Sequence, residues 1–138
     1  MPSRSFWWAC LVLAPPLAWA AAASGYGMAR RTPGTDLALL ALGAVLEELV
    51  FRGGIQAWLL RRWPARALGV SAANLLASLL FAAAHLWAHP PVAALGVLPV
   101  SLVLGTAYER SGERLGPPIA LHLYFNLLLY GATALLAR

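Results

Sequence analysis

The chain has 138 residues, of which 61% are hydrophobic and only 11% are charged. A soluble domain carries about 25% charged residues and leaves much of its surface in water, so this composition favours a membrane protein. The net charge of +5 comes from ten Arg residues spread between apolar runs, not from a basic stripe interleaved with aromatics, which excludes a nucleic-acid-binding face. A single cysteine, Cys10, excludes an internal disulfide.

Five apolar segments predict an all-α fold, a polytopic transmembrane helix bundle with about five spans. They are Phe6 to Met28, Leu37 to Leu60, Ala67 to Ala88, Val92 to Tyr108 and Pro117 to Ala137. Each approaches the ~20 residues that a helix needs to cross about 30 Å of hydrocarbon. We expect one transmembrane domain over residues 1–138, in which residues 1–35 form an N-terminal span and loop.

The first segment has two interpretations. Arg4, the apolar stretch and the small residues from Ala20 to Ser24 are typical of a cleaved secretory signal, but Pro15 and Pro16 interrupt the run. We expect a retained span. Asp36, at the start of the second segment, is expected to cap a helix.

Arginines outside the spans predict the orientation. With a cytoplasmic N-terminus, the inner side carries the larger set, Arg4, Arg61, Arg62, Arg66, Arg110 and Arg114, and the outer side carries Arg30, Arg31 and Arg138. The positive-inside rule therefore favours this orientation. We expect an integral protein of the bacterial inner membrane with its N-terminus in the cytoplasm.

The second segment holds two adjacent carboxylates, although each costs roughly 2.5 kcal/mol or more at the centre of a membrane helix. Glu48 and Arg52 are four residues apart and can form an ion pair. Glu47 points about 100° away around the helix and has no partner of opposite charge at helical spacing. It must face an aqueous cavity, find polar partners on other helices or stay protonated. The alternative is that Glu47, Glu48 and Arg52 form a buried polar cluster whose only role is to stabilise the helix bundle.

Further polar residues lie on two other segments. His85 is on the third, where an interfacial histidine is the alternative interpretation. His122 and Asn126 are four apart on the fifth and share a face; hydrogen bonding between helices is the alternative for them. One unpaired glutamate, two histidines and one asparagine could together activate water and stabilise an oxyanion.

The same residues could instead hold a divalent metal such as zinc through Glu47, His85 and His122, with the metal activating the water. The sequence has no HExxH motif, so a zincin arrangement on one helix is absent. The choice between metal-dependent and glutamate-dependent chemistry stays open.

Four motifs carry a family resemblance. The string from Glu47 to Arg52 resembles the EExxxR motif of the CAAX protease and bacteriocin-processing (CPBP) family, and Phe81 to His85 resembles its FxxxH motif. Gly105 to Tyr108, with Gly112, is similar to the glycine-and-tyrosine stretch before the last motif, and His122 to Asn126 resembles the HxxxN motif. Order and spacing agree over residues 36–130, which we expect to form a CAAX-protease-like core of four helices.

The resemblance implies an intramembrane endopeptidase that cuts a membrane-associated protein or peptide near its C-terminus. By motif, Glu47 would be the general base, His85 its partner in activating water, and His122 with Asn126 the oxyanion hole. Glu48 and Arg52 would support them. The alternative is a non-catalytic immunity or peptide-binding protein that uses the same polar core.

The resemblance also bears on partners. Expected partners are membrane lipids and a substrate with a C-terminal processing signal, and nucleic acid is not expected. Many family members have about eight spans, so a second copy of this short chain could complete the cavity.

A count of 1.5 Å per residue from the inner face gives depths of roughly 20 Å for Glu47, 27 Å for His85 and 8 Å for His122. These depths do not meet if every span is straight. A third span that starts near Ser71 would bring His85 level with Glu47, and His122 would still need a tilted helix.

Overall fold

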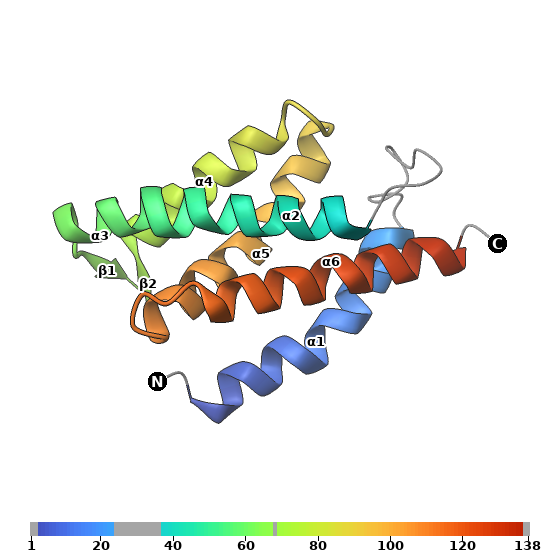
Figure 1. Cartoon of the computed structure of the whole chain (residues 1–138), viewed down its shortest axis with the longest axis horizontal. Helices are drawn as coiled ribbons and strands as arrows, with labels where there is room; N and C mark the ends of the chain where they lie inside the picture. The colour runs from blue at the N-terminus through green and yellow to red at the C-terminus, as the bar shows by residue number, and fades with distance from the viewer. Residues whose placement is uncertain (1–2, 24–36, 68, 137–138) are drawn as a thin grey trace.

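The computed structural model describes residues 3–23, 37–67 and 69–136, and these form a bundle of helices (Figure 1). In chain order the elements are α1 (Arg4–Ala23), α2 (Leu37–Glu48), η2 (Leu49–Gln56), α3 (Ala57–Arg62), β1 (Arg66–Ala67), β2 (Val70–Ser71), α4 (Ala72–His85), α5 (Pro91–Arg110) and α6 (Gly116–Leu136). The predicted all-α bundle is confirmed. The predicted cap Asp36 lies outside the described residues.

The second predicted segment forms one continuous helical segment with three parts. Twelve residues of α2 run into eight residues of the π-helix η2 and then into six residues of α3. Gly53 and Gly54, both poor helix formers, lie inside the π-helical part. A π-helix widens the turn and is found mostly at functional sites, which makes this stretch a place to look for chemistry.

The third predicted segment is shorter than expected. The helix begins at Ala72 and not at Ala67, because Ser71 is its N-cap. The Ser71 side chain accepts a hydrogen bond from the backbone N–H of Asn74 at 2.9 Å. The residues before the cap form a two-stranded antiparallel hairpin, whose turn includes Gly69 at a φ of 81°. α4 therefore has 14 residues and ends at His85.

α5 is the central helix of the bundle. It packs against α4, α6 and η2, while α1 covers the outer side of α6 (Figure 1). Small residues let α5 approach its neighbours closely. At Gly105, a Cβ atom would lie 1.9 Å from Oδ1 of Asn74 on α4, so only glycine fits.

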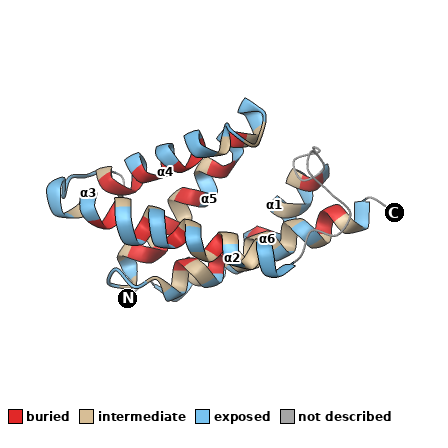
Figure 2. Cartoon of the chain, turned by 45° about the horizontal axis from the view of Figure 1, so that its top comes forward, coloured by how far each residue is buried: buried red, intermediate tan, exposed pale blue. Residues whose placement is uncertain are grey.

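Three of the described helices, α1, α5 and α6, are long and apolar enough to cross a membrane, and α4 is a shorter apolar helix. Buried positions lie mostly where helices face one another (Figure 2). Many large apolar residues, among them Trp8, Leu39 and Leu95, are exposed. Such an apolar exterior suits contact with lipid.

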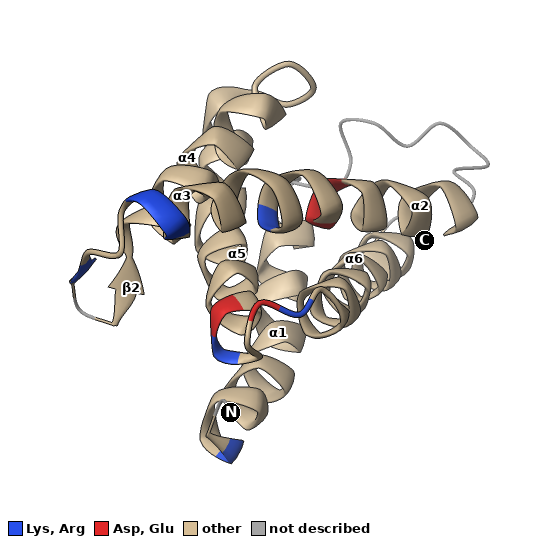
Figure 3. Cartoon of the chain, turned by 60° about the vertical axis from the view of Figure 1, so that its left-hand side comes forward, with Lys and Arg blue, Asp and Glu red and all other residues tan. Residues whose placement is uncertain are grey.

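Apart from the charged residues in the middle of the α2 to α3 segment, charged positions lie at the end of the bundle formed by α3, the hairpin, the N-terminus of α1 and the α5–α6 connection (Figure 3). Arg110 at the end of α5 stacks over Phe6 near the start of α1, 5.1 Å from the ring centroid. Arg62 likewise stacks over Trp58 at 4.6 Å. The arginines that were predicted to face the cytoplasm and that belong to these elements therefore share one end.

Candidate active site

The first part of the site is a buried ion pair where α2 becomes η2. Glu48 is the last residue of α2, and its Oε2 lies 3.1 Å from Nε of Arg52, one turn further on. Arg52 Nη2 donates to both the carbonyl and the hydroxyl oxygen of Ser101 on α5, at 2.8 and 2.9 Å. The guanidinium also lies over the Phe81 ring, 5.1 Å from its centroid. The predicted Glu48–Arg52 pair is confirmed.

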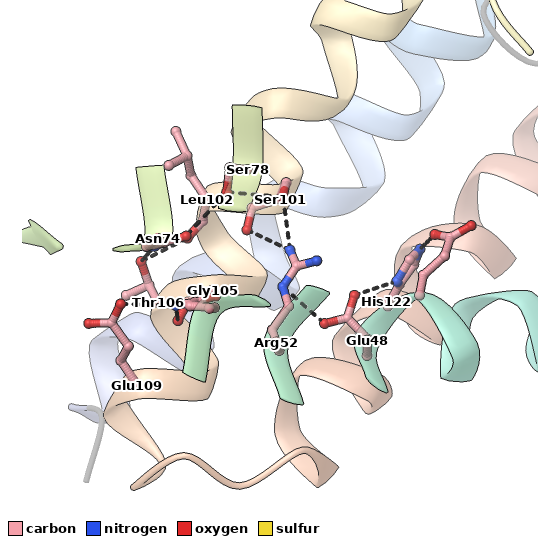
Figure 4. A network of polar contacts seen from close by, with 12 residues as sticks. Glu48, Arg52, Asn74, Ser78, Ser101, Leu102, Gly105, Thr106, Glu109 and His122 are labelled. Carbon is pink, nitrogen blue, oxygen red and sulfur yellow. Dashed lines mark hydrogen bonds and ion pairs between the residues drawn. The ribbon is translucent and has the colours of Figure 1, made fainter. Parts of the chain in front are cut away.

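The second part is an imidazole between two carboxylates. Nδ1 of His122 on α6 lies 2.8 Å from Oε1 of Glu48, and Nε2 lies 3.6 Å from Oε2 of Glu47 (Figure 4). A carboxylate that accepts a hydrogen bond from Nδ1–H fixes the tautomer of the ring. The nitrogen that faces Glu47 is then Nε2, at a distance longer than a hydrogen bond.

The two adjacent glutamates differ sharply in exposure. The Glu48 side chain is 0% exposed, whereas that of Glu47 is 38% exposed. Glu48 contacts Arg52 with one oxygen and His122 with the other. Glu47 has the imidazole as its neighbour and is partly exposed, so of the two carboxylates only Glu47 has a side that the protein does not cover.

His85 ends α4 next to an aromatic ring. Its Nδ1 lies 2.9 Å from the carbonyl of Phe81, its ring centroid is 4.4 Å from that of Phe81, and it stacks on His89 at 5.8 Å. Phe81 also packs at 6.2 Å against His122, so it lies next to both imidazoles. In the part of the chain that the structure describes, no ion pair or hydrogen bond joins His85 to Glu47.

Asn126 follows His122 by one turn of α6. It is partly exposed, and its amide makes no hydrogen bond to another described residue. The structure thus brings Glu47, Glu48, Arg52 and His122 into one cluster. His85 lies beside that cluster, and Asn126 has an amide that is free to donate.

Some polar residues behind the cluster were not singled out from the sequence. They are Ser71, Asn74 and Ser78 on the α4 side, Ser101 and Glu109 on α5, and Gln56 on η2. Their signal was a spacing of three or four residues within apolar segments, which places each set on one helix face.

The proposed metal ligands do not form a complete site. Among the residues in 3–23, 37–67 and 69–136, no group of three His, Cys, Asp or Glu side chains could hold a metal ion. Of the predicted set, Glu47 and His122 are adjacent, whereas no ion pair or hydrogen bond joins His85 to Glu47 within the described residues. A catalytic zinc site has three protein ligands, so these residues do not fit such a site, and no step is assigned to a metal.

Comparison with known proteins places the chain in a family. Residues 6–128 match the family model described as type II CAAX prenyl endopeptidase Rce1-like. No curated protein and no solved structure matches the chain. The matched range runs from α1 into α6 and includes Glu47, His85, His122 and Asn126. The chain belongs to the type II CAAX prenyl endopeptidase Rce1-like family and is an integral membrane protein.

Proposed function

We propose that the protein is an intramembrane endopeptidase that hydrolyses a peptide bond near the C-terminus of a membrane-associated protein or peptide, with Glu47 as the general base. One observation carries the proposal. Glu47 combines 38% side-chain exposure with an imidazole 3.6 Å away, directly beside an ion pair that is already neutralised. A carboxylate of this kind can accept a proton from water, whereas Glu48 is fully committed.

In this mechanism Glu47 takes one proton from a water molecule, and the water oxygen bonds to the carbonyl carbon of the substrate. Nε2 of His122, which faces Glu47, shares that proton and stabilises the charge that develops. The free amide of Asn126 donates to the oxyanion on the same helix face. When the C–N bond breaks, the proton passes to the leaving amine, and an acid and an amine are released.

His85 enters the proposal as a second imidazole. Because its Nδ1 is next to the Phe81 carbonyl, Nε2 is the nitrogen left for water or substrate. His85 lies one turn after Phe81 on α4, and the Phe81 ring also packs against His122, so Phe81 lies between His85 and the cluster. The 3.6 Å between Nε2 of His122 and Glu47 makes His122 the partner of the general base, and we assign His85 to the substrate or its water.

The surroundings of the site fit a protein in the bacterial inner membrane with the arginine-rich end in the cytoplasm. Membrane lipids cover the apolar exterior, and the substrate carries a C-terminal processing signal. A second copy of the chain could cover the open side of Glu47. The predicted divalent metal, such as zinc, would need a third ligand beside Glu47 and His122, and metal analysis of the purified protein tests for it.

The deciding variant is Glu47→Gln, with Glu109→Gln as a matched control because Glu109 is a second buried glutamate outside the site. The purified protein in lipid nanodiscs is given two probes, a farnesylated C-terminal CAAX peptide and a peptide with an apolar helix followed by a basic tail. Glu47→Gln should abolish cleavage, a loss of at least ~10²-fold, while Glu109→Gln keeps it. Full cleavage by Glu47→Gln contradicts the proposal.

The same variant tests the non-catalytic alternative. An immunity or peptide-binding protein would bind its peptide equally well with and without the Glu47 carboxylate and would cleave neither probe. Parallel reactions with a chelator, followed by addition of zinc, test the metal-dependent form of the chemistry.

A further inference from the structure

A row of buried polar side chains lies between α4 and α5, behind the motif residues. Ser101, Ser78 and Asn74 are all fully buried. In a membrane bundle an unpaired polar group costs several kcal/mol, so each must have a partner. Their partners are one another and Arg52, and together they form a connected line of hydrogen bonds (Figure 4).

The hydrogen bonds in this row all run in one direction. Arg52 Nη2 donates to Ser101 Oγ at 2.9 Å, Ser101 donates to Ser78 Oγ at 3.0 Å, and Ser78 donates to Oδ1 of Asn74 at 3.2 Å. Hydrogen bonds aligned in this way polarise one another, and a cation at the donor end strengthens them. The row starts at the guanidinium and ends at an acceptor, so the Ser101 hydroxyl serves as acceptor and donor at once.

The far end of the row is fixed to the rest of the bundle. The Asn74 side chain donates to the Leu102 carbonyl at 3.0 Å and to Thr106 Oγ1 at 3.2 Å, both on α5. Its backbone N–H donates to Ser71, and the Ser71 hydroxyl in turn donates to Glu109. Contacts with α5 therefore hold the far end of the row in place.

The near end of the row determines where the guanidinium of Arg52 lies. Its hydrogen-bond acceptors are the two oxygens of Ser101, and its ion-pair partner is Glu48. In the described part of the chain its Nη1 has no partner, so the position of the group depends on these contacts. Glu48 then presents its other oxygen to Nδ1 of His122.

We propose that Ser101, supported by Ser78 and Asn74, is a positioning residue for peptide hydrolysis, which sets the orientation and tautomer of His122 through Arg52 and Glu48. The inference rests on the proposed function. Ser101 touches neither Glu47 nor the reacting atoms, and it acts by keeping Nε2 of His122 directed at Glu47. No motif of the family resemblance includes Ser101, Ser78 or Asn74.

The first test measures cleavage kinetics of the full-length protein in nanodiscs. Ser101→Ala should lower kcat by roughly 10-fold with KM changed less than about twofold, since a hydrogen bond to a charged group is lost and substrate contacts are kept. Ser78→Ala, one link further away, should lower kcat by only about threefold. The control is Thr133→Val, which removes a buried hydroxyl that donates to carbonyls of its own helix.

Ser101→Cys separates hydrogen bonding from packing. Cysteine keeps the volume of the side chain but is a weak acceptor and donor, so kcat should stay close to that of Ser101→Ala. If Ser101→Cys has the kcat of the wild type, packing alone matters and the inference is wrong. This variant also carries the test if Ser101→Ala does not fold.

A second readout does not depend on cleavage. The ¹⁵N resonances of the His122 ring should show a protonated Nδ1 in the wild type and should move toward averaged positions in Ser101→Ala, but not in Thr133→Val. Unchanged His122 resonances and an unchanged kcat in Ser101→Ala, in a protein that Glu47→Gln inactivates, overturn the inference alone. If Glu47→Gln stays active, the proposed function fails, and the resonances still report whether Ser101 sets the His122 ring.

Discussion

Two buried glutamates in this bundle have opposite surroundings. The side chain of Glu109, at the end of α5, is 5% exposed. It accepts hydrogen bonds from Gln56 on η2 and from Arg66 and Ser71 on the two strands of the hairpin. The side chain of Glu48, in the middle of the α2 to α3 helical segment, is 0% exposed and contacts both Arg52 and His122. One carboxylate joins structural elements, and the other joins a fixed cation to a titratable ring.

The two clusters differ in whether they contact an accessible acid. Three donors occupy the oxygens of Glu109, and the outermost of them is the exposed guanidinium of Arg66. The Glu48 cluster ends at His122, whose second nitrogen faces the accessible carboxylate of Glu47. Burial of a carboxylate alone is therefore poor evidence for catalysis. The stronger evidence is an accessible acid with few partners, Glu47, next to a buried acid whose two oxygens both have partners, Glu48.

The largest effect that the comparison predicts is at the Glu48–Arg52 pair. Glu48→Gln leaves the guanidinium buried without its counter-ion, which should lower the free energy of unfolding by about 3–5 kcal/mol. Thermal unfolding in detergent micelles or nanodiscs measures this loss. Cleavage should also fall, because a neutral amide replaces the charged acceptor of His122 Nδ1–H.

A double variant sharpens that prediction. Replacing the pair with Glu48→Leu and Arg52→Met removes both charges, and such replacements of buried pairs are often neutral or stabilising. The double variant should regain most of the stability and none of the cleavage. If it is no more stable than Glu48→Gln, the contacts to Ser101 and His122, and not the unpaired charge, account for the loss.

A smaller effect is expected at Glu109. Glu109→Gln replaces charge-assisted hydrogen bonds by neutral ones, so the free energy of unfolding should fall by about 1–3 kcal/mol. Because this cluster does not reach the reacting groups, kcat per folded molecule should change less than about twofold. A loss of kcat as large as that of Glu48→Gln would mean that the two clusters are not functionally distinct.

Contacts within one helix could be predicted from the sequence. The Glu48–Arg52 pair needs only a spacing of four residues, and the apolar segments needed only hydropathy. The motifs predicted that Glu47 and His122 share one site, but the depth count placed them at different levels, because it treats the spans as straight with known ends. The cap at Ser71 moves the start of α4 from Ala67 to Ala72, and contacts between helices determine how α6 approaches α2.

The row behind the site was harder to predict for a different reason. A serine or threonine in a membrane helix can donate to its own preceding turn, as Thr106 does to the Leu102 carbonyl at 2.8 Å. The sequence does not show whether Ser101 bonds within its helix or across to Arg52. Gly105 was read as part of a motif, whereas in the fold it makes room for Asn74.

The smallest effect is expected at the open end of the Glu109 cluster. Arg66 is 54% exposed, and its Nη2 lies 2.5 Å from Oε2 of Glu109. Exposed ion pairs contribute about 0–1 kcal/mol, and salt screens them. Since Gln56 and Ser71 still donate to Glu109, Arg66→Ala should lower the melting temperature only slightly at low salt and not measurably at high salt. If Arg66→Ala lowers the melting temperature as much as Glu109→Gln does, Arg66 is the main partner of this carboxylate. The buried donors would then contribute little, and the contrast between Glu109 and Glu47 would be weaker.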